Sequence, residues 1–472
     1  MDKNFSKYLD IKYDNLIKIV DRLKNNFEYV SILASDCEGK VIRVSNQNIT
    51  IKDSSWQERG FVVRVFHNRL FSEYSFDDFD NVNEICQSVI ESSDVSDQLY
   101  KAIYIKNGKN ECYDEETIRK SFSKMGEFHD MSLDEIISSC QKIIQDSMEE
   151  NEYIISANCS VEYLKISKVF ISSKKNLKQV YAWANANYQC IVNKNDITKF
   201  NYAGESGVSL LETINKLKNK ITKINDDATA LLDSKHVLPG EYDCITSPEI
   251  SGLIAHEAFG HGVEMDMFVK NRAMGKNYIN QKVGSELVEM HEGAIPYNDV
   301  SSYYFDDEGT LAQDTIEIKN GILKTGIADA ITAKQLNILP TGNGKRENYQ
   351  RKAYSRMTTT YFSPKHHTLK EMIESIEFGY LIDGELSGME DPKNWGIQCC
   401  ALIGKEIKNG KLTGNVVSPL IITGNVLELL NSVSMVSNDF ELYGSGACGK
   451  GYKEWVKTSL GGPYMKVRVK LG

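Results

Sequence analysis

The sequence predicts an α+β protein in two parts. We expect an N-terminal mixed α/β domain of antiparallel sheets with helices over residues 1–234, and a β-rich domain over residues 235–472 that contains a helix with a metal-binding pattern. Three observations lead to this prediction. Strand-like segments cluster instead of alternating regularly with helices, the second half is dense in turn residues, and 472 residues suffice for two or three domains with separate cores.

The N-terminal half contains both helical and strand-like patterns. Apolar residues at helical spacing predict helices, and short runs rich in Val, Ile, Tyr and Phe predict strands. The expected helices cover residues 5–32, 115–125, 133–151 and 210–232, with a further one that begins at 85–91. The expected strands cover residues 29–34, 41–44, 61–71, 152–161, 163–172 and 179–192.

The C-terminal half has two hairpin signals between strand-like flanks, Asn320-Gly321 and Asn409-Gly410. An Asn-Gly pair suits the two left-handed positions of a tight hairpin turn. Helices are expected at the start of this half and near residues 369–378. These patterns predict a β-rich domain with few helices.

Composition excludes several classes of function. The net charge is −10 and the isoelectric point is near 5.5, which argues against broad binding of nucleic acid or of anionic membranes. No segment has the apolar length of a membrane span or the pattern of a signal peptide. The ten cysteines are scattered, as in reduced proteins. We therefore expect a cytoplasmic protein.

Residues 247–266 are typical of a helix with a well-defined start. Ser247 suits the N-cap, and Pro248 suits the first helical position. The segment contains His256-Glu257-x-x-x-His261, one residue longer than the familiar metalloprotease spacing.

The extra residue has a structural consequence. Two residues four apart lie about 40° from each other around a regular helix, whereas two residues five apart lie about 140° from each other. A π-bulge would absorb one residue and return both histidines to one face. Gly260 and Gly262 flank His261 and reduce the cost of such a distortion. We predict a distorted or broken helix at Gly260.

The motif has two interpretations. One is a helix with two partly buried histidines and no metal. The other is a metal site in which His256 and His261 bind through neutral imidazoles and Glu257 is the base that activates a water molecule. A catalytic zinc ion normally has three protein ligands and an open position, so a third ligand is required.

Three residues are candidates for this ligand. Glu264 and Asp266 are close in sequence to the two histidines, but their spacing suits hydrogen bonds that orient the ligands at least as well as metal binding. Cys448 lies in a glycine-rich stretch, and the nearby Lys450 would favour its thiolate. Taken alone, a cysteine of this kind is more often a plain buried thiol.

A polar, aromatic segment contains Arg346, Tyr349 and Arg356. This segment would suit a substrate groove, and a solvated loop explains its composition equally well.

At this point the sequence resembles the TldD/PmbA metalloproteases, the proteins long called modulators of DNA gyrase. The resemblance covers most of the second half and consists of several motifs in the same order. They are His256-Glu257-Ala258-Phe259-Gly260-His261, Asp306-Asp307-Glu308-Gly309-Thr310, residues 341–349, residues 356–361, Cys448-Gly449-Lys450 and Gly461-Gly462-Pro463. The first half resembles the family poorly.

The resemblance implies a TldD-like zinc peptidase in which His256, His261 and Cys448 hold the ion, with iron as an alternative metal, and Glu257 is the base. It also implies cleavage of unfolded polypeptides or peptides and a dimer, either a homodimer or a heterodimer with a TldE/PmbA-like subunit. The N-terminal domain would then form dimer contacts and a cavity wall. A non-hydrolytic, metal-stabilised peptide-binding or accessory subunit is the alternative function.

Overall fold

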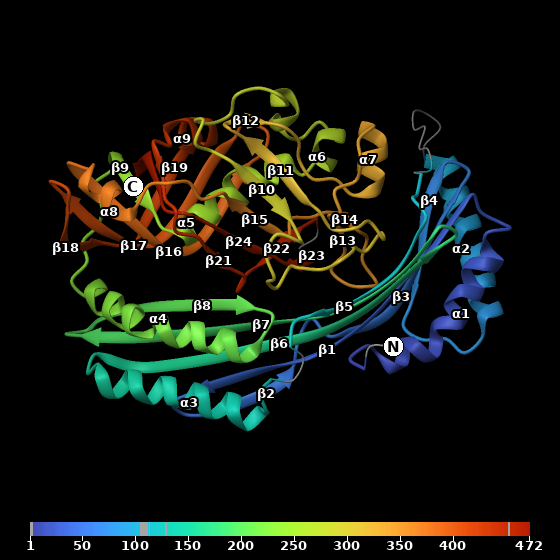
Figure 1. Ribbon diagram of the computed structural model, residues 1–472, viewed down its shortest axis with the longest axis horizontal. Coiled ribbons are helices and arrows are strands. Elements are labelled where there is room, and N and C mark those ends of the chain that lie inside the picture. The colour runs from blue at the N-terminus through green and yellow to red at the C-terminus, as the bar shows by residue number, and fades with distance from the viewer. Residues whose placement is uncertain (1–2, 104–111, 113, 128–129, 452–453) are drawn as a thin grey trace.

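The computed structural model describes residues 3–103, 112, 114–127, 130–451 and 454–472. In Figure 1 the first half of the chain forms a long, curved sheet with four helices, and the second half forms a β-rich part that lies against this sheet. Helices and mostly antiparallel sheets occur in both halves, so the predicted α+β class is confirmed.

The sheet of the N-terminal half has the strand order β4-β3-β1-β6-β7-β5, with β2 paired to β1 and β8 paired to β7. Its strands are β1 (Tyr29–Ser45), β2 (Ile49–Asp53), β3 (Glu58–His67), β4 (Leu70–Phe76), β5 (Ile118–Met125), β6 (Ile154–Ser172), β7 (Lys175–Lys194) and β8 (Ile197–Gly207). The helices are α1 (Lys7–Leu23), α2 (Val82–Ile103), α3 (Leu133–Glu150) and α4 (Leu210–Leu231).

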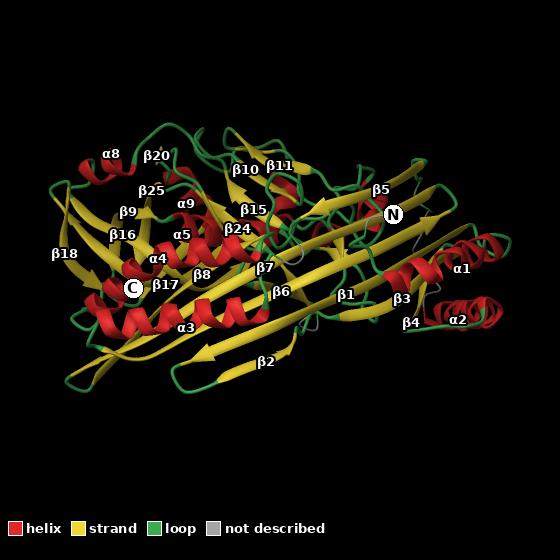
Figure 2. Cartoon of the chain, turned by 60° about the horizontal axis from the view of Figure 1, so that its bottom comes forward, coloured by secondary structure: helices red, strands yellow, loops and turns green. Residues whose placement is uncertain are grey.

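The two faces of this sheet have different partners. Along β1, Ile32 and Ile42 face the helices, Ile32 in the core with α1 and α2 and Ile42 in the core with α3 and α4. Figure 2 shows these two helix pairs at opposite ends of the sheet. Leu33 and Cys37 point the other way and pack against residues of the C-terminal half, among them Phe305 and Tyr303.

The C-terminal half contains two larger sheets and two isolated strand pairs. One sheet has the order β12-β11-β10-β15-β24-β21, the other has the order β16-β9-β25-β19-β17-β18 with β20 on β25, and the pairs are β13-β14 and β22-β23. The strands are β9 (Gly240–Thr246), β10 (Met290–Gly293), β11 (Asp314–Lys319), β12 (Ile322–Leu323), β13 (Gly344–Lys345), β14 (Tyr354–Ser355), β15 (Thr359–Phe362), β16 (Phe378–Asp391), β17 (Gly396–Lys408), β18 (Lys411–Val417), β19 (Leu420–Asn425), β20 (Met435–Val436), β21 (Glu441–Tyr443), β22 (Ala447–Lys450), β23 (Glu454–Lys457), β24 (Ser459–Gly462) and β25 (Met465–Leu471). The helical segments are α5 (Pro248–Leu253), the π-helix η1 (Ile254–Phe259), the 3₁₀-helix η2 (Gly260–Val263), α6 (Asp266–Val269), the 3₁₀-helix η3 (Met274–Tyr278), α7 (Ala330–Leu336), α8 (Leu369–Glu374) and α9 (Val426–Ser432).

Local sequence signals predicted several elements correctly. Asn320 and Gly321 have φ of 50° and 74°, and Asn409 and Gly410 have φ of 51° and 72°, so both predicted hairpin turns are confirmed. The Ser132 hydroxyl caps α3, in a reciprocal arrangement with the third residue of the helix.

The helix predicted over residues 115–125 is wrong, because residues 118–125 form β5, which pairs in parallel with β7. Phe122 of this strand stacks on Tyr304 at 4.9 Å between ring centroids. The pairing with β7 and this stacking outweigh the local helical pattern. Two other helices are shorter than predicted: α1 ends at Leu23 and α8 ends at Glu374.

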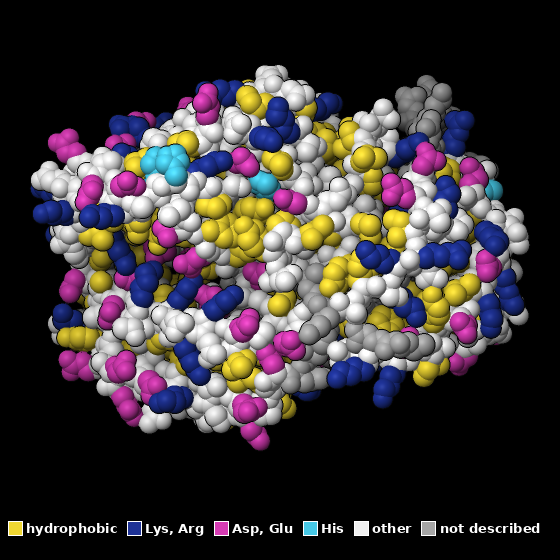
Figure 3. Space-filling model, in the orientation of Figure 1, with side chains coloured by type: hydrophobic (Ala, Val, Ile, Leu, Met, Phe, Trp, Pro, Cys, Tyr) yellow, Lys and Arg dark blue, Asp and Glu magenta, His cyan; other side chains and the backbone are white. Residues whose placement is uncertain are grey.

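Figure 3 shows side chains of both charges interspersed on the face that it presents, with an apolar area over the middle of the C-terminal half. Among the residues that the structure describes, none of the helices has the length and apolarity that crossing a membrane requires.

Candidate metal centre

The helix that carries the histidine motif changes its geometry along its length. It starts as α5, where the Ser247 hydroxyl accepts from the backbone N–H of Ile250 at 3.3 Å. It continues as the π-helix η1 and ends as the 3₁₀-helix η2. A π turn contains one more residue than an α turn, so His256 and His261 approach each other, with 5.3 Å between ring centroids. The predicted distortion at Gly260 is confirmed.

The reason for glycine at this position differs from the expected one. Gly260 has φ of −58°, a value open to any residue, and the break in the backbone falls on Phe259, with φ of −135°. A Cβ atom on Gly260 would lie 2.5 Å from Sδ of Met357 and 2.9 Å from the carbonyl oxygen of Ala255. Glycine is therefore required for close packing and not for backbone freedom.

The structure brings His256, His261 and Cys448 together, with one potential ligand atom of each within 4.8 Å of the others. Cys448 lies on β22, 187 residues after His261, and its Sγ is 3.6 Å from Nε2 of that residue. Burial opposes ionisation of the Cys448 thiol, but the hydrogen bonds and charges of His256 and His261 outweigh burial and lower its pKa to about 4. Two imidazoles and a thiolate, gathered in this way, fit the donor set of a zinc site.

His261 is held from its other side. Its Nδ1 lies 3.1 Å from Oε2 of Glu264, which is the contact that turns Nε2 of an imidazole toward a metal. Glu264 also pairs with Nζ of Lys450 at 3.2 Å, and Lys450 pairs with Asp266 at 2.7 Å. Glu264 and Asp266 therefore lie around the ligands and not among them. Lys450 was expected to favour the Cys448 thiolate, but its ammonium group pairs with these two carboxylates instead.

His256 has a different set of neighbours, which the sequence did not reveal. Its Nδ1 lies 3.5 Å from the hydroxyl oxygen of Thr360 on β15. Thr360 in turn donates to Oε2 of Glu292, at 2.5 Å, on the adjacent strand β10. Burial raises the pKa of Glu292, and the donors of Thr358 and Thr360 counteract it. The segments that carry these residues have no local pattern that relates them to His256.

Glu257 faces the same centre from the open side. Its Oε2 lies 3.6 Å from Nε2 of His261 and its Oε1 lies 3.9 Å from Nε2 of His256, and a quarter of its side chain is exposed. Gly388 of β16 packs against it so closely that a Cβ atom there would lie 2.6 Å from Cβ of Glu257. The carboxylate is therefore both next to the three candidate ligands and accessible to solvent.

Of the three residues expected in a substrate groove, Arg346 lines a cavity between the two halves, Tyr349 packs against the N-terminal sheet and Arg356 is buried. Arg356 is buried and donates to the carbonyl oxygens of Cys448 and Glu454, so it holds the β22–β23 hairpin and does not line a groove. Arg346 pairs with Glu73 of β4 at 3.0 Å. Tyr349 packs over Gly60 of β3, where a Cβ atom would lie 2.2 Å from its ring. Arg346 and Tyr349 thus connect the two halves of the chain.

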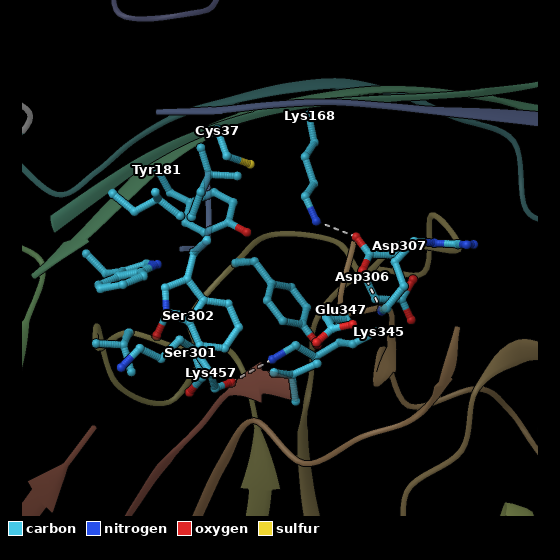
Figure 4. A pocket seen from close by; sticks show the side chains of 18 of the residues that line it. Cys37, Lys168, Tyr181, Ser301, Ser302, Asp306, Asp307, Lys345, Glu347 and Lys457 are labelled. Carbon is cyan, nitrogen blue, oxygen red and sulfur yellow. Dashed lines mark hydrogen bonds and ion pairs between the residues drawn. The ribbon is translucent and has the colours of Figure 1, made fainter. Parts of the chain in front are cut away.

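A cavity of about 90 Å³ lies between the two halves. Figure 4 shows Lys168 reaching into it from the sheet, where it pairs with Asp307, and Lys345 reaching in from the C-terminal half. Burial, and then the charge of Arg356, lower the pKa of Lys345 to about 7. Lys457 also lines the cavity, and it lies on the face of the β22–β23 hairpin opposite to Cys448. One hairpin therefore separates the candidate metal centre from this cavity.

Residues 239–470 match the family model described as the PmbA/TldA metallopeptidase C-terminal domain. The chain is 26% identical over 421 residues to metalloprotease MJ0996 of Methanocaldococcus jannaschii, which covers 86% of this chain and 90% of that protein. It is 33% identical over 230 residues to the zinc metalloprotease TldD homolog of Saccharolobus solfataricus, which covers 48% of this chain and 51% of that protein.

Among solved structures, TldE from Thermococcus kodakarensis matches with a TM-score of 0.74 and 16% sequence identity, covering 97% of this chain and 100% of that chain. This likeness concerns the fold. It extends over both halves, including the N-terminal half.

Proposed function

Because the chain belongs to the TldD/PmbA family of metallopeptidases, we propose that it is a zinc-dependent peptidase that cleaves unfolded polypeptides or peptides. One observation carries the proposal. His256, His261 and Cys448 each direct one donor atom into a space less than 4.8 Å across, and the Glu257 carboxylate faces the same space from the solvent side. This is the arrangement of three ligands, one open position and one base that metal-assisted hydrolysis requires.

In this mechanism His256, His261 and Cys448 would hold the ion through Nε2, Nε2 and Sγ. When bound, zinc would polarise the scissile carbonyl and lower the pKa of a water molecule. Glu257 takes the proton of this water and passes it to the leaving amine. Glu264 orients His261 through its Nδ1, at 3.1 Å, and Arg356 holds the backbone of Cys448.

Several features of the proposal go beyond the family assignment. We propose zinc as the physiological metal, with iron as the alternative, since one relative is named a zinc metalloprotease. We propose a dimer in the cytoplasm, and the similarity to a TldE fold makes a TldE-like subunit a reasonable partner. Within it, residues 1–234 would form a domain that contributes dimer contacts and a cavity wall, and residues 235–472 would form the peptidase domain.

The test is incubation of the purified chain with a denatured protein, with and without a chelator, followed by mass mapping of the products. We expect fragments that disappear with the chelator and return when zinc is added. A stoichiometric metal without any cleavage, by the chain alone or with a TldE-like subunit, would instead support the non-hydrolytic accessory function.

A further inference from the structure

A histidine binds a metal through one ring nitrogen when the other carries the proton, so the tautomer of a ligand matters. We propose that Thr360 and Glu292 form a relay that fixes the tautomer of His256 and leaves its Nε2 free for metal. The inference rests on the proposed metal site. Neither residue is among the three candidate ligands, so both are positioning residues.

The direction of the relay follows from the donors around Glu292. Its Oε1 accepts from the backbone N–H of Thr358 at 2.5 Å, from the Thr358 hydroxyl, and from Nδ2 of Asn343 at 3.2 Å. Its Oε2 accepts from the Thr360 hydroxyl. A hydroxyl has a single hydrogen, so Thr360, having donated to Glu292, offers a lone pair to His256. In the proposed tautomer the proton therefore lies on Nδ1, 3.5 Å from this oxygen.

The arrangement is rigid. His256, Glu292 and Thr360 are each almost completely buried, so water does not compete for these hydrogen bonds. Glu292 and Thr360 are direct partners on the antiparallel strands β10 and β15. Their side chains therefore lie on the same face of the sheet, next to η1, which carries His256.

Replacement of Glu292 by glutamine reverses the direction of the hydrogen bonds between residue 292, Thr360 and His256. A glutamine amide has one oxygen and one NH₂ group, and the site of Oε1 faces the N–H groups of Thr358 and Asn343. The Asn343 amide cannot turn to avoid this, because its Nδ2 also donates to the carbonyl oxygen of Arg356 at 3.1 Å, while its Oδ1 accepts from the Thr341 hydroxyl at 2.8 Å. The glutamine oxygen must therefore remain there, and its NH₂ must face Thr360.

Thr360 then accepts from the glutamine, and its own hydrogen turns to Nδ1 of His256. This stabilises the tautomer with the proton on Nε2, the atom that should bind metal. Glu292→Gln thus preserves shape and hydrogen-bond number but is expected to oppose metal binding. Thr360→Val removes the relay without reversing it, and Thr360→Ser keeps it.

The adjacent residue provides a matched control. Thr359 is equally buried on β15, but its hydroxyl bonds to Ser301 at 3.0 Å on the opposite face. Thr359→Val therefore loses a buried hydroxyl of the same strand without touching His256.

The experiment uses the full-length chain with ¹⁵N-labelled histidine. Long-range nitrogen–proton NMR spectra of the metal-free protein, recorded at a pH where the ring is neutral, give the tautomer of His256. They are recorded in a Cys448→Ala background, because the Cys448 thiolate accepts a hydrogen bond from His256 and would by itself hold the proton on Nε2. Zinc affinity is measured in parallel by competition with a chelator. We expect an Nδ1–H tautomer in the parent, Thr360→Ser and Thr359→Val proteins, and an Nε2–H tautomer in Glu292→Gln. Zinc affinity should fall by about 10- to 100-fold in Glu292→Gln and Thr360→Val.

An unchanged tautomer in Glu292→Gln, or parental zinc affinity in both variants, would overturn the relay. The tautomer measurement needs neither metal nor substrate. If only the peptidase proposal were wrong, these spectra would be as expected and no cleavage would be observed. Failure of the relay is therefore distinguishable from failure of the proposed peptidase function.

Discussion

The guanidinium group of Arg356 donates to the carbonyl oxygen of Cys448 at 2.6 Å. A second hydrogen bond, to the carbonyl oxygen of Glu454 at 2.9 Å, spans the two strands of the β22–β23 hairpin. These strands pair only with each other among the described elements. Side chains such as Arg356 therefore decide where Cys448 lies relative to His256 and His261.

Arg356→Met should displace this hairpin. The variant removes two buried hydrogen bonds from a charged donor, at about 1.5–3 kcal/mol each, so the free energy of unfolding should fall and zinc affinity should fall with it. Denaturant unfolding and chelator competition measure the two effects. Arg351→Met, an exposed residue of the same segment, serves as control, and equal behaviour of the two variants would contradict the proposed role.

Glu257→Gln should retain zinc and lose cleavage. The carboxylate is adjacent to the three candidate ligands but is not one of them, so its loss removes the base and not the site. General bases contribute about 10²–10⁴-fold to the rate, and we expect a fall in kcat of that size. Measured zinc content together with turnover of a denatured protein tests this, with the exposed Glu286→Gln as control. Substantial cleavage by the variant would remove Glu257 from the mechanism.

The Cys448 thiol should be ionised at neutral pH in the metal-free protein. The two imidazoles lower its pKa to about 4, below the ordinary thiol value of about 8.5, so the thiolate should persist above pH 4 and disappear as the pH falls through that value. Ultraviolet thiolate absorbance measures this. Cys448→Ser should abolish the band at pH 7, whereas Cys399→Ser should not, because burial raises the pKa of Cys399 to about 12. A band that survives Cys448→Ser would refute the assignment.

Gly260→Ala should disturb the junction between η1 and η2. The added methyl group meets Met357 and the carbonyl oxygen of Ala255 at less than 3 Å, and such overpacking costs about 1–3 kcal/mol. We expect lower thermal stability and weaker zinc binding. Gly446→Ala is the matched control, since a Cβ atom there has no neighbour within 4 Å. Met357→Ala combined with Gly260→Ala should recover part of the loss, because it removes the sulfur contact and leaves the carbonyl contact.

The sequence by itself determined the features that depend on neighbouring residues. The Asn320-Gly321 turn and the Ser132 cap follow from the local conformational and hydrogen-bonding preferences of those residues. The spacing of His256 and His261 likewise requires a distorted helix if both rings are to share one face, because a regular helix directs two residues five apart toward different sides.

The tertiary structure decided whatever depends on distant strands. Residues 118–125 became a strand because β7 offered a partner, against their local helical pattern. Arg356 is buried and donates to the carbonyl oxygen of Cys448, although the polar, aromatic segment around it suited an exposed groove. Thr360 and Glu292 reached His256 because β10 and β15 lie side by side beneath η1. Hydrogen bonds of this kind depend on positions in space that no periodicity along the chain encodes.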